Sequence, residues 1–118
     1  MNNQDLSDVE GVQGFIGACL VDSESGMIIN AVGGGALDME VAGAANTDVV
    51  KAKLRAMRDL GLDDAIEDIL ITLGKQYHLI RPLASEPSVF IYLAIDRATA
   101  NLALARVALR KADKTISG

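Results

Sequence analysis

The chain has 118 residues, half of them hydrophobic and 23% charged, and this balance predicts one globular domain spanning residues 1–118 rather than a disordered chain. Its formal net charge of −5 disfavours nonspecific binding to DNA or anionic membranes. The longest nearly apolar run, residues 14–21, is too short to cross a membrane, and no basic or apolar leader precedes it, so we expect a cytoplasmic protein.

The first third of the chain predicts a short helix followed by a hairpin. Residues 5–10 suit a helix that is stable only when packed on the rest of the domain. Residues 14–21 are apolar on both alternating faces, which is typical of a strand covered on both sides. Residues 22–26 have turn composition, and residues 27–31 form the returning strand, which ends at Gly33–Gly35.

Residues 38–60 predict a long helix with Gly61 as its C-cap. Its apolar arc is too wide for a helix that touches one surface only. One stripe has side chains small enough to let another helix approach closely: Ala42, Ala45, Val49, Ala52 and Ala56. A second stripe beside it has bulkier side chains: Val50, Leu54 and Met57. Poor helix formers at 46–48 indicate a break there.

The second half of the chain predicts three strands and a final helix. The strands are residues 66–73, 77–83 and 89–95, the last apolar on both faces and therefore central. Asp96 is expected to N-cap a helix over 97–116. The order αββαβββα with doubly apolar strands predicts an α/β (α+β) fold, a three-layer α/β/α sandwich on a five-stranded, mostly antiparallel sheet.

No constellation of residues indicates catalysis, a metal site or a cofactor. His78 has no positioned nucleophile, Cys19 lies in a doubly apolar strand, and Glu67 and Asp68 would face opposite sides of a strand. Gly33–Gly35 lacks the residues of a phosphate-binding loop and is expected to be a flexible connection. With four aromatic residues in the chain, a nucleic-acid stacking platform is disfavoured.

Charge is unevenly distributed along the chain. Residues 1–50 carry eight acidic and no Lys or Arg residues, whereas residues 51–118 carry eleven basic and eight acidic residues. This asymmetry fits either complementary surfaces between subunits or ordinary solvated faces. A free edge at residues 66–73 would be an aggregation-prone strand, which favours its pairing with a second copy.

The order of elements and several segments resemble the Roadblock (dynein light-chain) family, including its bacterial members, over about residues 5–116. The segments that carry the resemblance are Gly11–Gly14, Val21–Met27, Tyr77–Leu83, Asp96–Arg97 and Asn101–Arg106. The resemblance implies a profilin-like Roadblock fold and a non-catalytic, dimerising module that binds Ras-like small GTPases or serves as an adaptor in motor and signalling complexes. Some bacterial members accelerate GTP hydrolysis without donating an arginine finger.

Combining the resemblance with the residue patterns, we expect a homodimer that binds and regulates a Ras-like small GTPase. The expected dimer interface comprises Ala45, Val49, Ala52, Ala56, Ile69 and Ile71, and the expected partner-binding residues are Lys53 and Arg58. The alternative is a small-molecule sensor or adaptor domain in a signalling complex, which would need polar groups converging on a pocket. An enzyme ranks below both.

Overall fold

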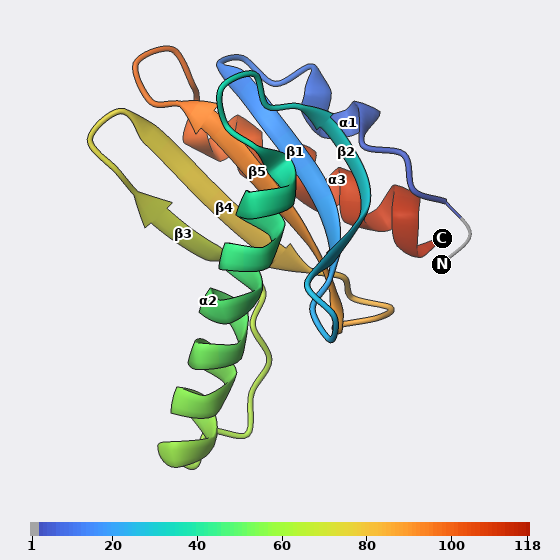
Figure 1. The fold of residues 1–118 in the computed structure, drawn as a ribbon, viewed down its shortest axis with the longest axis vertical. Helices are drawn as coiled ribbons and strands as arrows, with labels where there is room; N and C mark the ends of the chain where they lie inside the picture. The colour runs from blue at the N-terminus through green and yellow to red at the C-terminus, as the bar shows by residue number, and fades with distance from the viewer. Residues whose placement is uncertain (1–2) are drawn as a thin grey trace.

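A five-stranded antiparallel sheet forms the centre of the computed structural model, which describes residues 3–118 (Figure 1). Its strands lie in the order β2-β1-β5-β4-β3, and all neighbours pair antiparallel. The elements in chain order are α1 (Ser7–Glu10), β1 (Phe15–Asp22), β2 (Met27–Gly33), α2 (Met39–Asp59), β3 (Ile69–Thr72), β4 (Gln76–Pro82), β5 (Val89–Asp96) and α3 (Leu102–Ser117).

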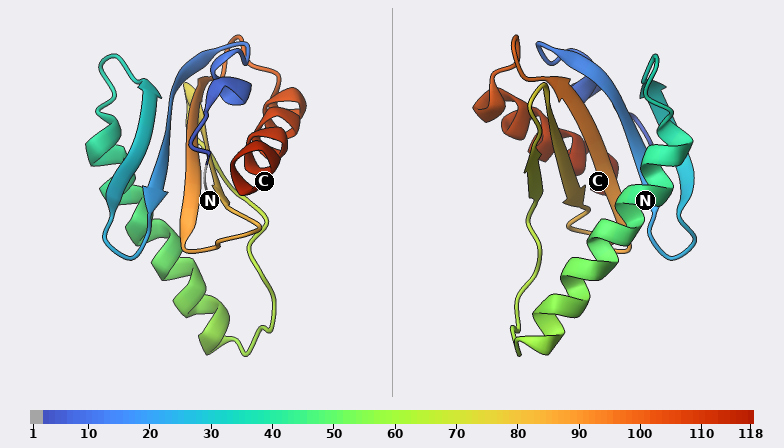
Figure 2. Two further views of the ribbon diagram at one scale, coloured as in Figure 1. Left: turned by 90° about the vertical axis from the view of Figure 1, so that its right-hand side faces the viewer. Right: turned by 60° about the vertical axis from the view of Figure 1, so that its left-hand side comes forward.

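The interior strands β1 and β5 separate two hydrophobic clusters. On one face, Leu20, Ile91 and Leu93 pack against α1 and α3. On the other face, Cys19, Val21 and Tyr92 pack against α2. Figure 2 shows the three resulting layers, with α2 and α3 on opposite sides of the sheet. The predicted α/β/α sandwich, its element order and the covering of residues 14–21 and 89–95 on both faces are confirmed.

Helix α2 packs closely against β1 and β2 through a glycine. A Cβ atom at Gly43 would lie 3.1 Å from Ile28 Cγ1 and 3.3 Å from Val21 Cγ2, so only glycine lets the helix approach this far without displacing those side chains. The expected break at 46–48 is absent. Asn46 Nδ2 donates to the Ala42 carbonyl at 2.7 Å and Thr47 Oγ1 to the Gly43 carbonyl at 2.8 Å, so both side chains are satisfied within the helix.

The connection from β2 to α2 runs through three glycines with positive φ, at 67° for Gly33, 109° for Gly34 and 54° for Gly35. Gly34 donates its N–H to the Ile16 carbonyl at 2.8 Å, which fastens the turn to β1. Asp38 then caps α2 by accepting from the N–H of Glu40 at 2.9 Å. We expected this run to be a flexible connection. Its backbone instead follows a defined path with positive φ angles, which residues other than glycine rarely adopt.

The predicted start of the last helix at residue 97 is wrong. Asp96 ends β5, and its carboxylate accepts from Thr99 Oγ1 at 3.1 Å within a turn, while its carbonyl accepts from the Ala100 N–H at 3.0 Å. The N-cap is Asn101, whose Oδ1 accepts from the Leu104 N–H at 3.1 Å. Ala98, which the predicted helix over 97–116 would include, therefore lies outside the helix and is exposed.

Strand β3 is shorter than the predicted strand 66–73. Residues 66–68 belong to the connection from α2, and Thr72 is the last residue paired with β4. Glu67 and Asp68 therefore do not alternate along a strand. They contact two different arginines, with Glu67 Oε1 3.9 Å from Arg81 Nη1 and Asp68 Oδ2 3.3 Å from Arg106 Nε.

The cap of α3 yields a first prediction. Asn101→Ala removes the side-chain bond to the first turn of α3 and should lower the free energy of unfolding by about 1 kcal/mol, whereas Asn101→Asp should retain the cap. Asp96→Ala, which removes an exposed hydrogen bond to Thr99, should cost less. Urea denaturation of the three variants measures the difference, and a larger loss for Asp96→Ala than for Asn101→Ala would contradict this cap assignment.

Candidate interaction surface on the second helix and the edge strand

Helix α2 covers only part of the sheet face that it lies on. Its main sheet contacts are with β1 and β2, and Figure 1 shows its last turns projecting past the end of the sheet. On the same face, the pairing of Ile69 with Ile80 and of Ile71 with His78 places the β3 and β4 side chains in one row. Ile69, Ile71 and His78 remain partly exposed there. The result is an apolar area of sheet that no helix within residues 3–118 covers.

The projecting part of α2 carries apolar side chains that its own sheet does not bury. Leu54 is 40% exposed, and beyond the helix Leu60 is 69% and Leu62 is 52% exposed. In the small-residue stripe, Ala45 and Ala52 are exposed, and Val49 and Ala56 are half-buried. The helix buries a neighbouring stripe instead, centred on Ala42, Asn46 and Val50 among others. The stripe expected at the dimer interface is thus left open along the side of α2.

The outer edge of β3 is unpaired within the part of the chain that the structure describes. β3 is the last strand of the sheet, and its sequence Ile69–Thr72 contains no charged residue and no proline. An edge of this composition presents backbone donors and acceptors to any other strand. Because the edge adjoins the uncovered sheet face at Ile69 and Ile71, the two features form one continuous surface.

Two shallow grooves run between α2 and the segment that leads to β3. One, of about 560 Å³, is lined by Val50, Leu54, Ile66 and Pro87 among others. The other, of about 380 Å³, is lined by Met57, Leu62, Ile69 and Lys53 among others. Apolar side chains make up the larger part of both linings, but Asp64 and Glu67 line both grooves, Arg81 also lines the first and Asp68 the second. An apolar centre with charged residues around it is the usual composition of a surface that binds another protein.

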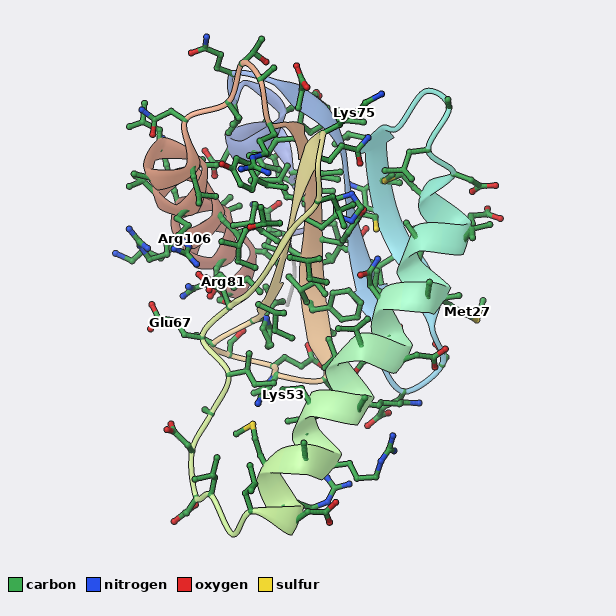
Figure 3. All side chains as sticks on the ribbon, turned by 90° about the vertical axis from the view of Figure 1, so that its left-hand side faces the viewer. Met27, Lys53, Glu67, Lys75, Arg81 and Arg106 are labelled. Carbon is green, nitrogen blue, oxygen red and sulfur yellow. The ribbon has the colours of Figure 1, made fainter. Side chains whose placement is uncertain are left out.

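The two expected partner-binding residues do not lie together. Lys53 and Arg58 are both exposed on α2, but five residues on a helix are separated by about 140° around its axis. Lys53 lines the groove that faces β3 and is labelled in Figure 3. The helical spacing places Arg58 on a different side of α2. Charge is unevenly distributed along α2: Glu40 and Asp48 lie in its first half, after the cap Asp38, and its four basic residues, Lys51, Lys53, Arg55 and Arg58, lie in its second half, which ends at Asp59.

An ion pair that the sequence analysis missed fastens α3 to β4. Arg81 Nε donates to Asp113 Oδ2 at 2.8 Å, and Asp113 also accepts from the Ala84 N–H at 3.1 Å and from Ser117 Oγ at 2.8 Å. Asp113 is 2% exposed. Removing one partner of such a buried pair costs about 3–5 kcal/mol. The signal in the sequence is an acidic residue directly after buried Ala112, on the inner side of an otherwise basic helix.

His78 and Cys19 are held in structural settings. His78 Nε2 lies 2.7 Å from Gln76 Oε1, and its Nδ1 lies 3.1 Å from the Tyr92 hydroxyl. Burial lowers the pKa of His78, which favours the neutral ring. Burial also raises the pKa of the Cys19 thiol to about 12, and that of Tyr92 to about 12 with a further contribution from Cys19. Both phenol and thiol therefore stay protonated at neutral pH.

Within residues 3–118, no three His, Cys, Asp or Glu side chains are close enough together to hold a metal ion. The same residues contain no helix with the length and apolar character needed to span a membrane.

Comparisons with known proteins identify the fold. No protein-family model matches the chain, and no curated protein matches it. Among solved structures, MglB from Myxococcus xanthus superposes with a TM-score of 0.77 at 19% identity, over 94% of this chain and 84% of that one. A Roadblock/LC7 domain from Streptomyces avermitilis has a TM-score of 0.82 at 14% identity, over 98% and 95% of the two chains.

A third structure, the gliding protein MglB from Thermus thermophilus, has a TM-score of 0.78 at 12% identity, over 95% of this chain and 82% of that one. The three likenesses extend over almost the whole chain. The fold is the Roadblock fold that the segments of the sequence indicated.

The raised pKa of Cys19 gives a second prediction. With a pKa of about 12, the thiol carries almost no thiolate at pH 8 in the folded protein, whereas unfolding restores a pKa close to 9. Ellman's reagent should therefore react slowly with the folded protein and rapidly in urea, with Cys19→Ala as the blank. Equal rates in the two conditions would show that the thiol is accessible in the fold.

Proposed function

We propose that the chain is a non-catalytic Roadblock-family module that forms a homodimer and, as a dimer, binds and regulates a Ras-like small GTPase. The proposal is supported by the fold shared with MglB from two bacteria and with a Roadblock/LC7 domain. It is also supported by the sequence segments that resemble the family. Regulation here means either scaffolding the GTPase or stimulating its hydrolysis by changing its conformation.

The observation that best supports a dimer is that α2 does not match the extent of the sheet face on which it lies. The helix extends beyond β1 and β2 with exposed apolar residues, while Ile69 and Ile71 of β3 and His78 of β4 remain partly exposed on the same face of the sheet. A two-fold axis beside β3 would bring the projecting half of each α2 over the uncovered face of the other copy. It would also pair the two β3 edges into one continuous sheet, which removes both edges.

The interface proposed for this arrangement combines the open stripe of α2 with the edge strand: Ala45, Val49, Ala52, Ala56, Ile69 and Ile71. The small side chains at 45, 52 and 56 would let two α2 helices approach closely. The charge along α2 supports an antiparallel approach. Side by side in opposite directions, the half that holds Glu40 and Asp48 would face the half that holds the basic residues of the partner.

The GTPase is proposed to bind on the α2 side, with Lys53 and Arg58 contributing positive charge. Exposed charges of this kind mainly accelerate encounter with an acidic face and add little affinity. Because the two residues point to different sides of the helix, their contributions should be separable. Lys53 lies closest to the groove at the edge of β3, and Arg58 lies on the exposed end of the projecting helix.

Fewer observations support the alternative, a small-molecule sensor. A sensor needs a pocket in which polar groups converge on the ligand. The sheet faces are filled by fully buried side chains such as Leu20, Ile91 and Leu93.

Our third prediction tests the dimer. Ala52→Glu places a charge in an interface that loses its water, so the variant should sediment as a folded monomer of 12.4 kDa or aggregate, whereas the wild type should sediment at twice that mass. The matched control is Ala44→Glu, the same change at an exposed position of α2 outside the open stripe. Circular dichroism checks that each variant is folded.

The control should remain a dimer. If Ala52→Glu and Val49→Glu both sediment as well-folded dimers with an unchanged dissociation constant, the α2 stripe is not in the interface. If the wild type is a monomer at concentrations well above the micromolar range, the homodimer itself is refuted.

The fourth prediction tests the GTPase site. The probe is a purified Ras-like small GTPase from the native host, loaded with GDP or with a non-hydrolysable GTP analogue, and the readout is the association rate at several salt concentrations. Arg58→Glu and Lys53→Glu should each slow association several-fold and weaken its dependence on salt. Lys75→Glu, on the β3–β4 turn, is the matched control and should change neither.

Unchanged association rates in both α2 variants would remove these residues from the partner site. Absence of binding to the GTPase in either nucleotide state, with the dimer intact by sedimentation, would contradict the regulatory function while leaving the assembly standing.

A further inference from the structure

The outer face of α3 is a second exposed surface, on the opposite side of the sheet from α2 (Figure 2). The inner stripe of α3, which includes Ala105, Leu109 and Ile116, is fully buried against the sheet. On the outer face, Leu104 is 63% exposed and Val107 is 52% exposed. Two large aliphatic side chains one turn apart on a helix form a small apolar patch that the described residues do not cover.

The last two turns of the same outer face are basic. Leu104, Val107, Lys111 and Lys114 follow one another at spacings of three and four, so they form a single stripe that is apolar at its start and cationic at its end. Arg110 flanks the stripe. Cations near a helix C-terminus also interact well with the helix dipole, but that effect is confined to the last turn and does not explain the exposed leucine and valine.

Part of this positive charge has no partner in the described part of the chain. Lys111 Nζ lies 3.6 Å from Asp8, and Arg106 Nε lies 3.3 Å from Asp68. Among residues 3–118, Arg110 and Lys114 form no ion pair. The only acidic residue of α3, Asp113, is buried and bonded to Arg81. The outer face of α3 therefore has an unbalanced positive charge on a protein whose net charge is −5.

A groove adjoins this basic end. It measures about 670 Å³ and is lined by Val107, Arg110, Lys114 and Arg81 among others. Arg81 Nη1 is buried and lacks a hydrogen-bond acceptor within the described residues, because Asp113 bonds to Nε and the carboxylate of Glu67 is 3.9 Å away. Since Nη1 is buried and Glu67 lines the grooves beside α2, the exposed charges that adjoin the α3 groove include those of Arg110 and Lys114. Figure 3 shows Arg81, Arg106 and Glu67 at the same side of the molecule as α3.

We propose that the outer face of α3 is a docking site for an acidic amphipathic helix of a second protein partner. The apolar stripe of the partner would pack on Leu104 and Val107, and its carboxylates would meet Arg110, Lys114 and the groove beside Arg81. A polyanion such as nucleic acid or a charged lipid surface fits less well, because Glu10 lies exposed on α1, which packs on α3, and the net charge of −5 would repel an extended negative surface.

The α3 residues of this site lie on the opposite face of the sheet from α2, whereas Arg81 also lines the groove of about 560 Å³ beside α2. One dimer would then present two α3 surfaces while α2 and β3 are occupied. The module would link its partner on α2 to an acidic helical segment elsewhere in a complex.

The fifth prediction uses a synthetic peptide probe: a fluorescein-labelled amphipathic helix of about 18 residues, with leucines on one face and glutamates on the others. Added to the full chain, it should bind with a dissociation constant in the micromolar range. Amide chemical-shift changes in the ¹⁵N-labelled protein should concentrate in residues 103–117 and 81–84. Arg110→Glu combined with Lys114→Glu should weaken binding at least about tenfold, and Leu104→Ala combined with Val107→Ala should weaken it several-fold.

The matched control is Lys51→Glu combined with Arg55→Glu, the same change of charge on α2, which should alter peptide affinity less than twofold. Sedimentation shows that the α3 variants keep the oligomeric state of the wild type, whatever that state is. The proposal is overturned if the glutamate peptide causes no shifts at millimolar concentration. It is also overturned if a lysine version of the peptide binds equally well, if the α2 control loses as much affinity, or if phosphatidylglycerol vesicles bind the protein more tightly than the peptide does.

Discussion

The structure depends on burying both faces of the β1–β5 pair. Every residue of β5 from Val89 to Ile95 is buried, so this strand requires cover from two sides. Helix α3, with α1, covers one side, and the buried pair between Arg81 and Asp113 holds α3 in place. Helix α2 covers the other side mainly over β1, β2 and part of β5, and leaves Ile69 and Ile71 at the β3 edge partly exposed. This incomplete second layer is the reason for proposing that a second copy of the chain covers the rest.

The sequence correctly predicts those helices and strands that are determined by residues close together in the chain. Double-sided hydrophobicity identifies the two interior strands, and the Gly61 signal places the end of the long helix within a residue or two. The last helix illustrates a failure of local reasoning. Asp96 and Asn101 are both good caps, and only the turn held by the Asp96 carbonyl and carboxylate decides that the helix begins after the second.

The exposed surfaces were harder to predict, because which side of a helix is buried depends on how the elements pack against one another. The Ala stripe and the bulkier stripe of α2 were visible in the sequence, but not which of them packs on the sheet of its own chain. Gly43, Asn46 and Thr47, all poor helix formers, turn out to lie on the sheet-facing side. Likewise, Lys53 and Arg58 were both expected at the partner site, and the helix geometry places them on different sides of α2. The Arg81–Asp113 pair joins residues far apart in sequence and had no signal beyond an acid on an inner stripe.

The central claim, that a second copy pairs with β3 and covers its face, is tested most directly by hydrogen exchange at the two edges of the sheet. β2 and β3 are both edge strands of the same molecule, so each serves as the reference for the other. The account predicts that the β3 amides pointing away from β4 exchange slowly, with protection that falls on dilution, while the outward amides of β2 exchange fast. Equally fast exchange at both edges, independent of concentration, would contradict it.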